Sequence, residues 1–146
     1  MGTNSINDVF EKFCDGVSLF GPFWDHVLGY WNLSKENPDR ILFLRFEDVK
    51  EKPGIYLRRL SGFLGCPFSG EEEETGVVDE ILRLCSFDNL RGLEVNMNGR
   101  LESGEVNSAF FRKGEVGDWR NCLDRGMVDR LDGISEERFR GSGLEL

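Results

Sequence analysis

The 146-residue chain has little of what a membrane protein or a general nucleic-acid binder requires. Its apolar runs are all far shorter than the roughly 20 residues of a membrane span. Basic residues are outnumbered, with 18 Lys and Arg against 27 Asp and Glu, which gives a net charge of −9. A general nucleic-acid binder needs a basic face that displaces counterions from phosphate. We therefore expect neither a membrane nor a nucleic acid as partner.

Candidate metal ligands are also scarce. The one histidine, His26, lies far in sequence from every cysteine, whereas zinc sites use closely spaced Cys and His residues. The first six residues lack the basic and apolar regions of a signal peptide. We therefore expect a cytoplasmic protein without a metal, whose thiols are reduced. The four cysteines form no Cys-x-x-Cys pair: Cys14, Cys66, Cys85 and Cys122.

Large hydrophobic residues are abundant, with 12 Phe and 3 Trp, and this excludes a disordered tail. The 18 Gly have no period and only 4 Pro accompany them, so a collagen-like chain is excluded as well. A chain of this length suits one domain that buries roughly 70% of its unfolded surface.

Apolar residues at helical spacing, together with capping and stop signals, predict most of the chain to be helical. Ser5 and Asp8 resemble a capping box at the start of the first helix. Pro22 and Pro53 each suit the first turn of a helix. Helices are predicted over residues 5–15, 22–31, 53–64, 71–85 and 125–140, and a loop over 88–109.

Residues 41–46, Ile-Leu-Phe-Leu-Arg-Phe, are the best candidate for a strand. The run is short and almost wholly apolar, which is typical of a strand buried on both faces of a parallel sheet. Such a strand needs hydrogen-bonded neighbours, and the sequence offers no second convincing strand. Either further strands have been missed or the chain is part of a larger α/β domain. A buried helical segment is a third interpretation, which the shortness of the run disfavours.

The most informative segment is 107–121, Asn-Ser-Ala-Phe-Phe-Arg-Lys-Gly-Glu-Val-Gly-Asp-Trp-Arg-Asn. Arg112 offers a planar fork to a phosphate, and Lys113 adds a point charge. Gly114 lets a backbone N–H approach an anion without a side chain in the way. From the residues alone two interpretations remain open: a phosphate-binding turn, or a charged surface turn anchored by Trp119.

This segment closely resembles the C-terminal signature of cytosolic sulfotransferases, Phe-Arg-Lys-Gly-x-x-Gly-Asp-Trp-(Arg/Lys)-Asn. Residues 21–31, Gly-Pro-Phe-Trp-Asp-His-Val-Leu-Gly-Tyr-Trp, resemble the substrate-side helix of that family. Residues 41–48 resemble its strand that ends in Tyr-Glu-Asp, and residues 84–87, Leu-Cys-Ser-Phe, resemble its adenine loop. The four blocks are most similar to plant members that sulfate flavonoids, steroids and other small hydroxylated compounds.

The resemblance implies an α/β fold, the C-terminal portion of a P-loop-kinase-like parallel-sheet domain. This chain would be mostly helical, with one clear buried strand at 41–46. Residues 1–146 would form the C-terminal half of a sulfotransferase domain. The family's loop Tyr-Pro-Lys-Ser-Gly-Thr-Thr-Trp with its catalytic Lys, and its catalytic His, have no counterpart here. No catalytic residue is therefore assigned to this chain, and we expect it to be inactive alone.

The activity implied is transfer of a sulfuryl group from 3′-phosphoadenosine-5′-phosphosulfate (PAPS) to a hydroxyl of a small-molecule acceptor (EC 2.8.2.-). Arg112, Lys113 and Gly114 would bind the 3′-phosphate of PAPS, and Phe111 would lie against the adenine. Phe87 would stack on the adenine. The other nucleotide-side positions are Ser86 and Cys85, which line the adenine, and Phe46, where the family has a Tyr.

On the acceptor side the resemblance points to His26, Trp24 and Phe23. His26 matches a histidine of the substrate helix and not the catalytic base, so it is either substrate-lining or a half-buried helix residue. The two aromatic residues either shape an acceptor pocket or belong to the core. Three hypotheses for the whole chain remain: part of a sulfotransferase, a non-catalytic remnant that binds nucleotide weakly or pairs with a partner, or an inactive fragment. The oligomeric state stays open.

Overall fold

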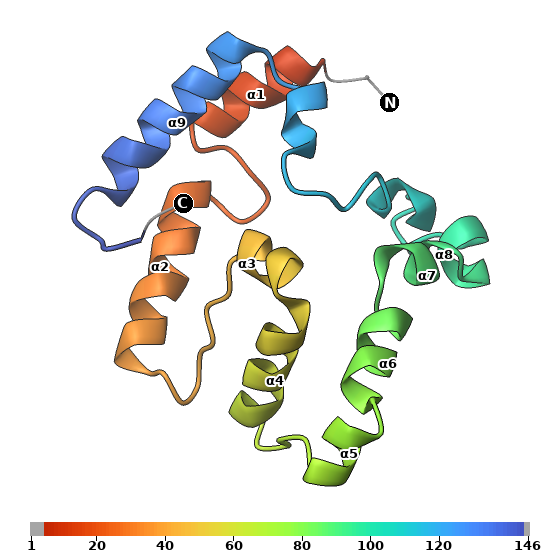
Figure 1. The fold of residues 1–146 in the computed structure, drawn as a ribbon. Coiled ribbons are helices and arrows are strands. Elements are labelled where there is room, and N and C mark those ends of the chain that lie inside the picture. The colour runs from red at the N-terminus through yellow and green to blue at the C-terminus, as the bar shows by residue number, and fades with distance from the viewer. Residues whose placement is uncertain (1–4, 145–146) are drawn as a thin grey trace. The chain divides into compact units, whose positions relative to one another are not determined.

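The computed structural model describes residues 5–144, which fall into two compact units. The terminal unit comprises the described residues up to Phe43 and those from Trp119 on, and the central unit is Leu44–Asp118. Every α-helix and 3-10 helix of this part of the chain is shown in Figure 1. Within residues 5–144, no helix has both the length and the apolar character needed to cross a membrane.

The terminal unit is built from three α-helices. The helix α9 packs against both α1 and α2 (Figure 1). Ser5 and Asp8 form a complete capping box at the start of α1, and Asp124 accepts a hydrogen bond from the N–H of Met127 at the start of α9 (2.9 Å). Each cap satisfies a backbone donor that the first turn leaves without an internal partner. The helices are α1 (Ile6–Cys14), α2 (Phe23–Glu36) and α9 (Arg125–Phe139).

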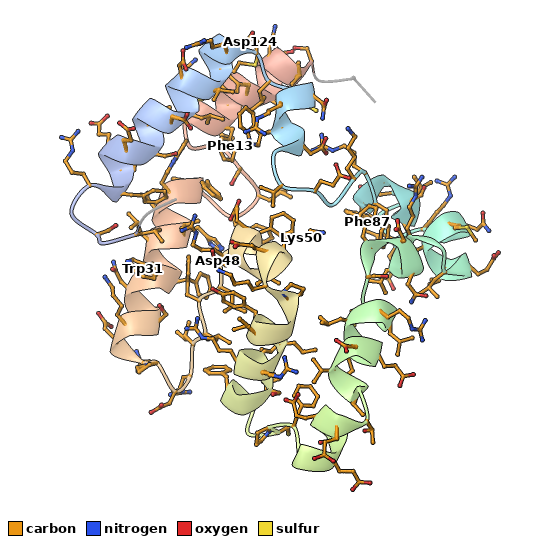
Figure 2. The ribbon with its side chains drawn as sticks, in the orientation of Figure 1. Phe13, Trp31, Asp48, Lys50, Phe87 and Asp124 are labelled. Carbon is orange, nitrogen blue, oxygen red and sulfur yellow. The ribbon has the colours of Figure 1, made fainter. Side chains whose placement is uncertain are left out.

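The core of the terminal unit forms around Trp24 of α2, which is only 2% exposed. Phe139 of α9 and Leu144 complete its buried centre. Phe13 and Trp31, both labelled in Figure 2, pack against this centre. The Trp24 indole N–H donates to the Ser135 hydroxyl (2.9 Å), so the buried polar atom of the ring is satisfied.

The central unit is a succession of short helices. The helix α4 packs on α6, and α8 packs on the 3-10 helix η1 (Figure 1). A second 3-10 helix, η2 (Asp118–Asn121), lies where the chain passes from this unit into the other. The elements of the central unit are α3 (Phe46–Glu51), α4 (Pro53–Phe63), α5 (Gly70–Glu74), α6 (Val77–Leu84), α7 (Phe87–Arg91), α8 (Glu94–Asn98) and η1 (Asn107–Phe110).

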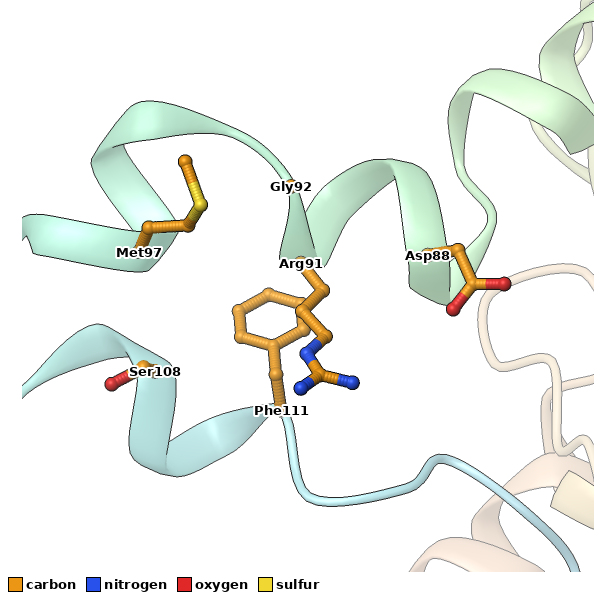
Figure 3. Close-up of a pocket in the computed structure, with 6 residues that line it drawn as sticks. All are labelled: Asp88, Arg91, Gly92, Met97, Ser108 and Phe111. Carbon is orange, nitrogen blue, oxygen red and sulfur yellow. The ribbon is translucent and has the colours of Figure 1, made fainter.

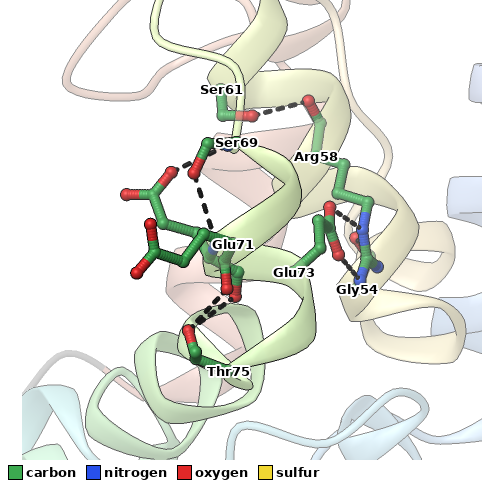
Figure 4. A network of polar contacts seen from close by, with 8 residues as sticks. Gly54, Arg58, Ser61, Ser69, Glu71, Glu73 and Thr75 are labelled. Carbon is green, nitrogen blue, oxygen red and sulfur yellow. Dashed lines mark hydrogen bonds and ion pairs between the residues drawn. The ribbon is translucent and has the colours of Figure 1, made fainter.

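A polar network joins α4 to the start of α5 (Figure 4). Arg58 of α4 donates two hydrogen bonds to the Glu73 carboxylate, from Nε (2.7 Å) and from Nη2 (2.6 Å). Ser69 caps α5: its hydroxyl accepts from the N–H of Glu72, whose carboxylate accepts from the N–H of Ser69. The bidentate pair of Arg58 and Glu73 has the geometry in which Arg binds a carboxylate most specifically.

The strand predicted at 41–46 is wrong: residues 41–45 have no regular secondary structure, and Phe46 begins α3. A strand exists only through hydrogen bonds to a neighbouring strand. Residues 5–144 contain a single isolated antiparallel bridge, Arg100 to Val106, and no strand that could pair with this segment. The side chains of 41–45 are half-buried, which accounts for their apolar character without a sheet.

Two further boundaries differ from the predictions. The single helix expected over 71–85 is two helices, α5 and α6, because Gly76 between them adopts a left-handed conformation (φ +80°). The loop expected over 88–109 contains most of α7, all of α8 and most of η1. The helices predicted over 5–15, 53–64 and 125–140 are confirmed to within one residue at each end. The helix predicted over 22–31 is confirmed and continues to Glu36.

Candidate functional site

The central unit ends in a loop, residues 111–117, followed by Asp118, the first residue of η2; we call residues 111–118 the cation loop. Arg112 Nε lies 2.8 Å from Asp118 Oδ2, and Lys113 Nζ lies 3.7 Å from Asp118 Oδ1. The two cationic side chains are 62% and 48% exposed, whereas the Asp118 side chain is only 9% exposed. The loop therefore presents two positive groups to solvent above one nearly buried carboxylate.

Gly114 lies at the centre of the cation loop with φ +64°, in the left-handed region. A Cβ atom at this position would lie 2.4 Å from Cδ2 of the Phe87 ring, a distance that real Cβ contacts do not reach. Glycine thus meets two requirements at once, the backbone conformation and the close approach of the loop to Phe87.

Phe87, the first residue of α7, is labelled in Figure 2. Its ring is tilted against that of Phe111, with the centroids 5.7 Å apart. Since Phe87 also contacts Gly114, the structure brings together three residues that the sequence placed in one nucleotide site. Arg112 and Lys113 follow directly in the chain, so a phosphate on the two cations would have an aromatic surface nearby.

The other predicted nucleotide-side residues lie in the same unit with different surroundings. Ser86 is the N-cap of α7, and its hydroxyl accepts from the N–H of Asn89 (3.3 Å). Cys85 is exposed at the end of α6. Phe46, the first residue of α3, is also exposed. Within residues 5–144, the ring contacts of Phe87 and Phe111 do not include Phe46.

The three predicted acceptor-side residues lie on α2, in the terminal unit. Trp24 is the buried centre of the core, which agrees with the second of the two interpretations given for it, a core residue. Phe23 is partly exposed and contacts the ring of Trp24, with centroids 5.9 Å apart. His26 is exposed and not half-buried, and it lies between the rings of Phe20 (6.0 Å) and Tyr30 (5.1 Å).

Phe111 is also one wall of a cavity of about 400 Å³ (Figure 3). Sequence reasoning missed its other walls because residues 88–109 were predicted to be a loop. Ser86, followed three residues later by Asn89, was the available signal, since a Ser in this position is typical of a helix start. The remaining lining residues are Asp88, Arg91, Gly92, Met97 and Ser108.

No group of three or more His, Cys, Asp or Glu side chains suited to a metal ion occurs within residues 5–144. The donor set of the cation loop, a guanidinium, an ammonium and a glycine N–H, suits an anion with several oxygens and not a cation.

Comparisons with known proteins agree on one family. A family model described as a sulfotransferase domain matches residues 2–143. Two Arabidopsis thaliana proteins, cytosolic sulfotransferase 5 and cytosolic sulfotransferase 6, are each 54% identical to this chain over 98% of its length. The chain spans only 44% of the length of each of these relatives.

Solved structures lead to the same family. A putative steroid sulphotransferase from Arabidopsis thaliana has a TM-score of 0.66 and 35% identity, over 97% of this chain and 38% of that one. The mouse sulfotransferase SULT7A1, solved in complex with PAP, has a TM-score of 0.75 and 26% identity, over 96% of this chain and 49% of that one. The helices described above therefore have counterparts in larger proteins of known fold.

Proposed function

The chain belongs to the sulfotransferase family, and from this premise we propose that it supplies the nucleotide-binding part of a PAPS-dependent sulfotransferase. The proposed reaction transfers a sulfuryl group from PAPS to a hydroxyl of a small acceptor such as a flavonoid or a steroid. Residues 1–146 would be the C-terminal half of a P-loop-kinase-like domain. The relatives are named cytosolic sulfotransferases, and we place this chain in the cytosol as well.

The observation that carries the proposal is the cation loop beside Phe87. Two exposed cations and a glycine N–H suit a phosphate, and the two rings suit an adenine. We assign the 3′-phosphate to Arg112, Lys113 and Gly114. The adenine is assigned to Phe87 and Phe111, with Ser86, Cys85 and Phe46 at its edge.

Charge supports a local mode of binding. The net charge of −9 repels an anionic nucleotide at long range, so attraction has to come from nearby cations. Residues 107–121 contain three basic and two acidic side chains, and this stretch is positive within an acidic chain.

Sulfuryl transfer also needs a base for the acceptor hydroxyl and a cation for the leaving oxygens. We assign neither of these groups to this chain, whose residues would hold and orient the nucleotide. Loss of a general base alone typically costs 10²- to 10⁴-fold in rate. We therefore propose that the isolated chain is inactive or nearly so. His26 and Phe23 would line the acceptor, supported from the core by Trp24.

A second candidate function is that of a non-catalytic module that binds a partner polypeptide. The observation that favours it is the half-buried segment 41–45: four of its five residues are apolar, and residues 5–144 place no strand beside it. A partner that supplied a neighbouring strand would pair with its backbone groups.

The proposal is tested by calorimetric titration of the purified chain with 3′,5′-adenosine bisphosphate. We expect weak binding that falls by about tenfold in Arg112→Ala and in Lys113→Ala, the loss of one charged hydrogen bond. Arg125→Ala is the matched control, because Arg125 is a 94% exposed cation of the terminal unit. Affinity that stays unchanged in both loop variants refutes the phosphate assignment.

A further inference from the structure

We propose that Asp118 is a positioning residue, which sets the spacing and orientation of Arg112 and Lys113 for the 3′-phosphate. This inference rests on the proposed function, because it assigns a role to a group that acts on the phosphate only through the two cations. The carboxylate holds the two side chains on different oxygens, Arg112 on Oδ2 (2.8 Å) and Lys113 on Oδ1 (3.7 Å). One planar group thereby determines the distance between the two positive charges.

Asp118 differs in solvent exposure from the two cations that it contacts. The Asp118 side chain is nearly buried, whereas both cationic side chains are about half exposed or more. Long Arg and Lys side chains lose rotamer freedom when they bind a ligand. A fixed carboxylate that orders them beforehand removes part of that cost, and affinity rises through preorganisation.

The contact with Asp118 allows two roles for this carboxylate. Asp118 meets Arg112 at Nε, the donor nearest the main chain. The alternative to positioning is that Asp118 occupies the phosphate position and competes with the ligand. The burial of the carboxylate favours positioning, because the cationic side chains are far more exposed than Asp118 and a ligand from solvent meets them first.

The test compares two nucleotides that differ by one phosphate, 3′,5′-adenosine bisphosphate and 5′-AMP. In the unmutated chain we expect the bisphosphate to bind more tightly, since only this nucleotide has a 3′-phosphate. Asp118→Asn should weaken the bisphosphate by about tenfold and leave 5′-AMP within about twofold, so that the preference shrinks. Glu73→Gln is the matched control, because it also removes one negative charge and one Arg–carboxylate ion pair from the central unit.

The binding results distinguish positioning by Asp118 from competition by Asp118, and both from a failure of the proposed function. No binding, or no preference in the unmutated chain, overturns the proposed function and this inference with it. A preference that Asp118→Asn retains, or equal weakening of both nucleotides, overturns positioning alone. Tighter binding of the bisphosphate in Asp118→Asn would show that the carboxylate is a competitor. In an Arg112→Ala background, Asp118→Asn should have a smaller effect, because one of the two held groups is gone.

A measurement on the unmutated chain keeps the inference testable if Asp118→Asn does not fold. The ¹⁵N–¹H heteronuclear NOE of the Arg112 Nε–Hε group reports side-chain order without any ligand. We expect a value close to that of ordered backbone amides, and a much lower value for the exposed Arg125. Equal, low values at both arginines would overturn the inference.

Discussion

Gly114 and Phe87 lie so close together that a single added methyl group at Gly114 would lie 2.4 Å from the Phe87 ring. The two residues are far apart in sequence, one in the cation loop and the other at the start of α7. Their contact connects the loop that bears the cations to the aromatic pair of Phe87 and Phe111. A site for a phosphorylated aromatic ligand depends on this connection, because neither part alone has both chemistries.

Gly114→Ala should therefore disturb both the loop and its contact with α7. The left-handed conformation costs a non-glycine residue about 1–2 kcal/mol, and the clash with the ring adds to this cost. We expect the free energy of unfolding to fall by about 2–3 kcal/mol. Binding of 3′,5′-adenosine bisphosphate should weaken as well. Urea unfolding followed by circular dichroism and calorimetric titration measure the two effects.

The matched control is Gly65→Ala. Gly65 has a similar φ of +74°, but nothing lies within 4 Å of the Cβ that it would gain. This variant isolates the conformational cost, which we expect to be about 1 kcal/mol with unchanged nucleotide affinity. Equal losses in the two variants would mean that the contact with Phe87 contributes nothing.

The ion pair between Arg58 and Glu73 predicts a pH dependence of stability. The hydrogen bonds from Arg58 hold the pKa of the Glu73 carboxyl below its ordinary value. A lowered pKa in the folded state stabilises the protein above the unfolded pKa of about 4.3. That contribution is lost as the pH falls through the lower, folded-state pKa. Glu73→Gln should therefore flatten the decline of unfolding free energy below about pH 4.

Urea unfolding between about pH 7 and pH 3 measures this slope. Arg58→Gln removes the other partner of the same ion pair, and it should flatten the curve to a similar extent. A slope that neither variant changes would contradict an origin in this ion pair, and would assign the acid sensitivity to other carboxylates.

The core of the terminal unit predicts a contrast between two phenylalanines. Phe139 is buried with Trp24 and Leu144, whereas Phe20 is 78% exposed. Phe139→Ala removes a buried ring and leaves a cavity, at a cost of about 3–5 kcal/mol. Phe20→Ala should change the free energy of unfolding by less than about 0.5 kcal/mol. Tryptophan fluorescence during urea unfolding follows both variants, and similar losses would contradict this core.

Local signals were sufficient for much of the helical structure. Ser5 with Asp8, and Pro53 at the start of α4, acted through hydrogen bonds and backbone constraints that reach only a few residues along the chain. The same kind of signal failed at residues 41–46, because an apolar run indicates burial and not the partner that a strand needs. It failed again over 71–85, where Gly76 turned one expected helix into two.

For the candidate site, too, some features were predicted from the sequence and others came only from the tertiary structure. The phosphate assignment came from the sequence, since Arg112, Lys113 and Gly114 are adjacent and their donors suit a phosphate, and it stays a prediction. Family membership was readable too, because four short blocks carried the resemblance and the comparisons confirmed it. Only the tertiary structure determined that Phe87 lies on Gly114, that Asp118 holds both cations, and that Trp24 is buried. The first and the third depend on contacts between segments distant in sequence. The second depends on how a short loop folds and on a solvent exposure that no local pattern specifies.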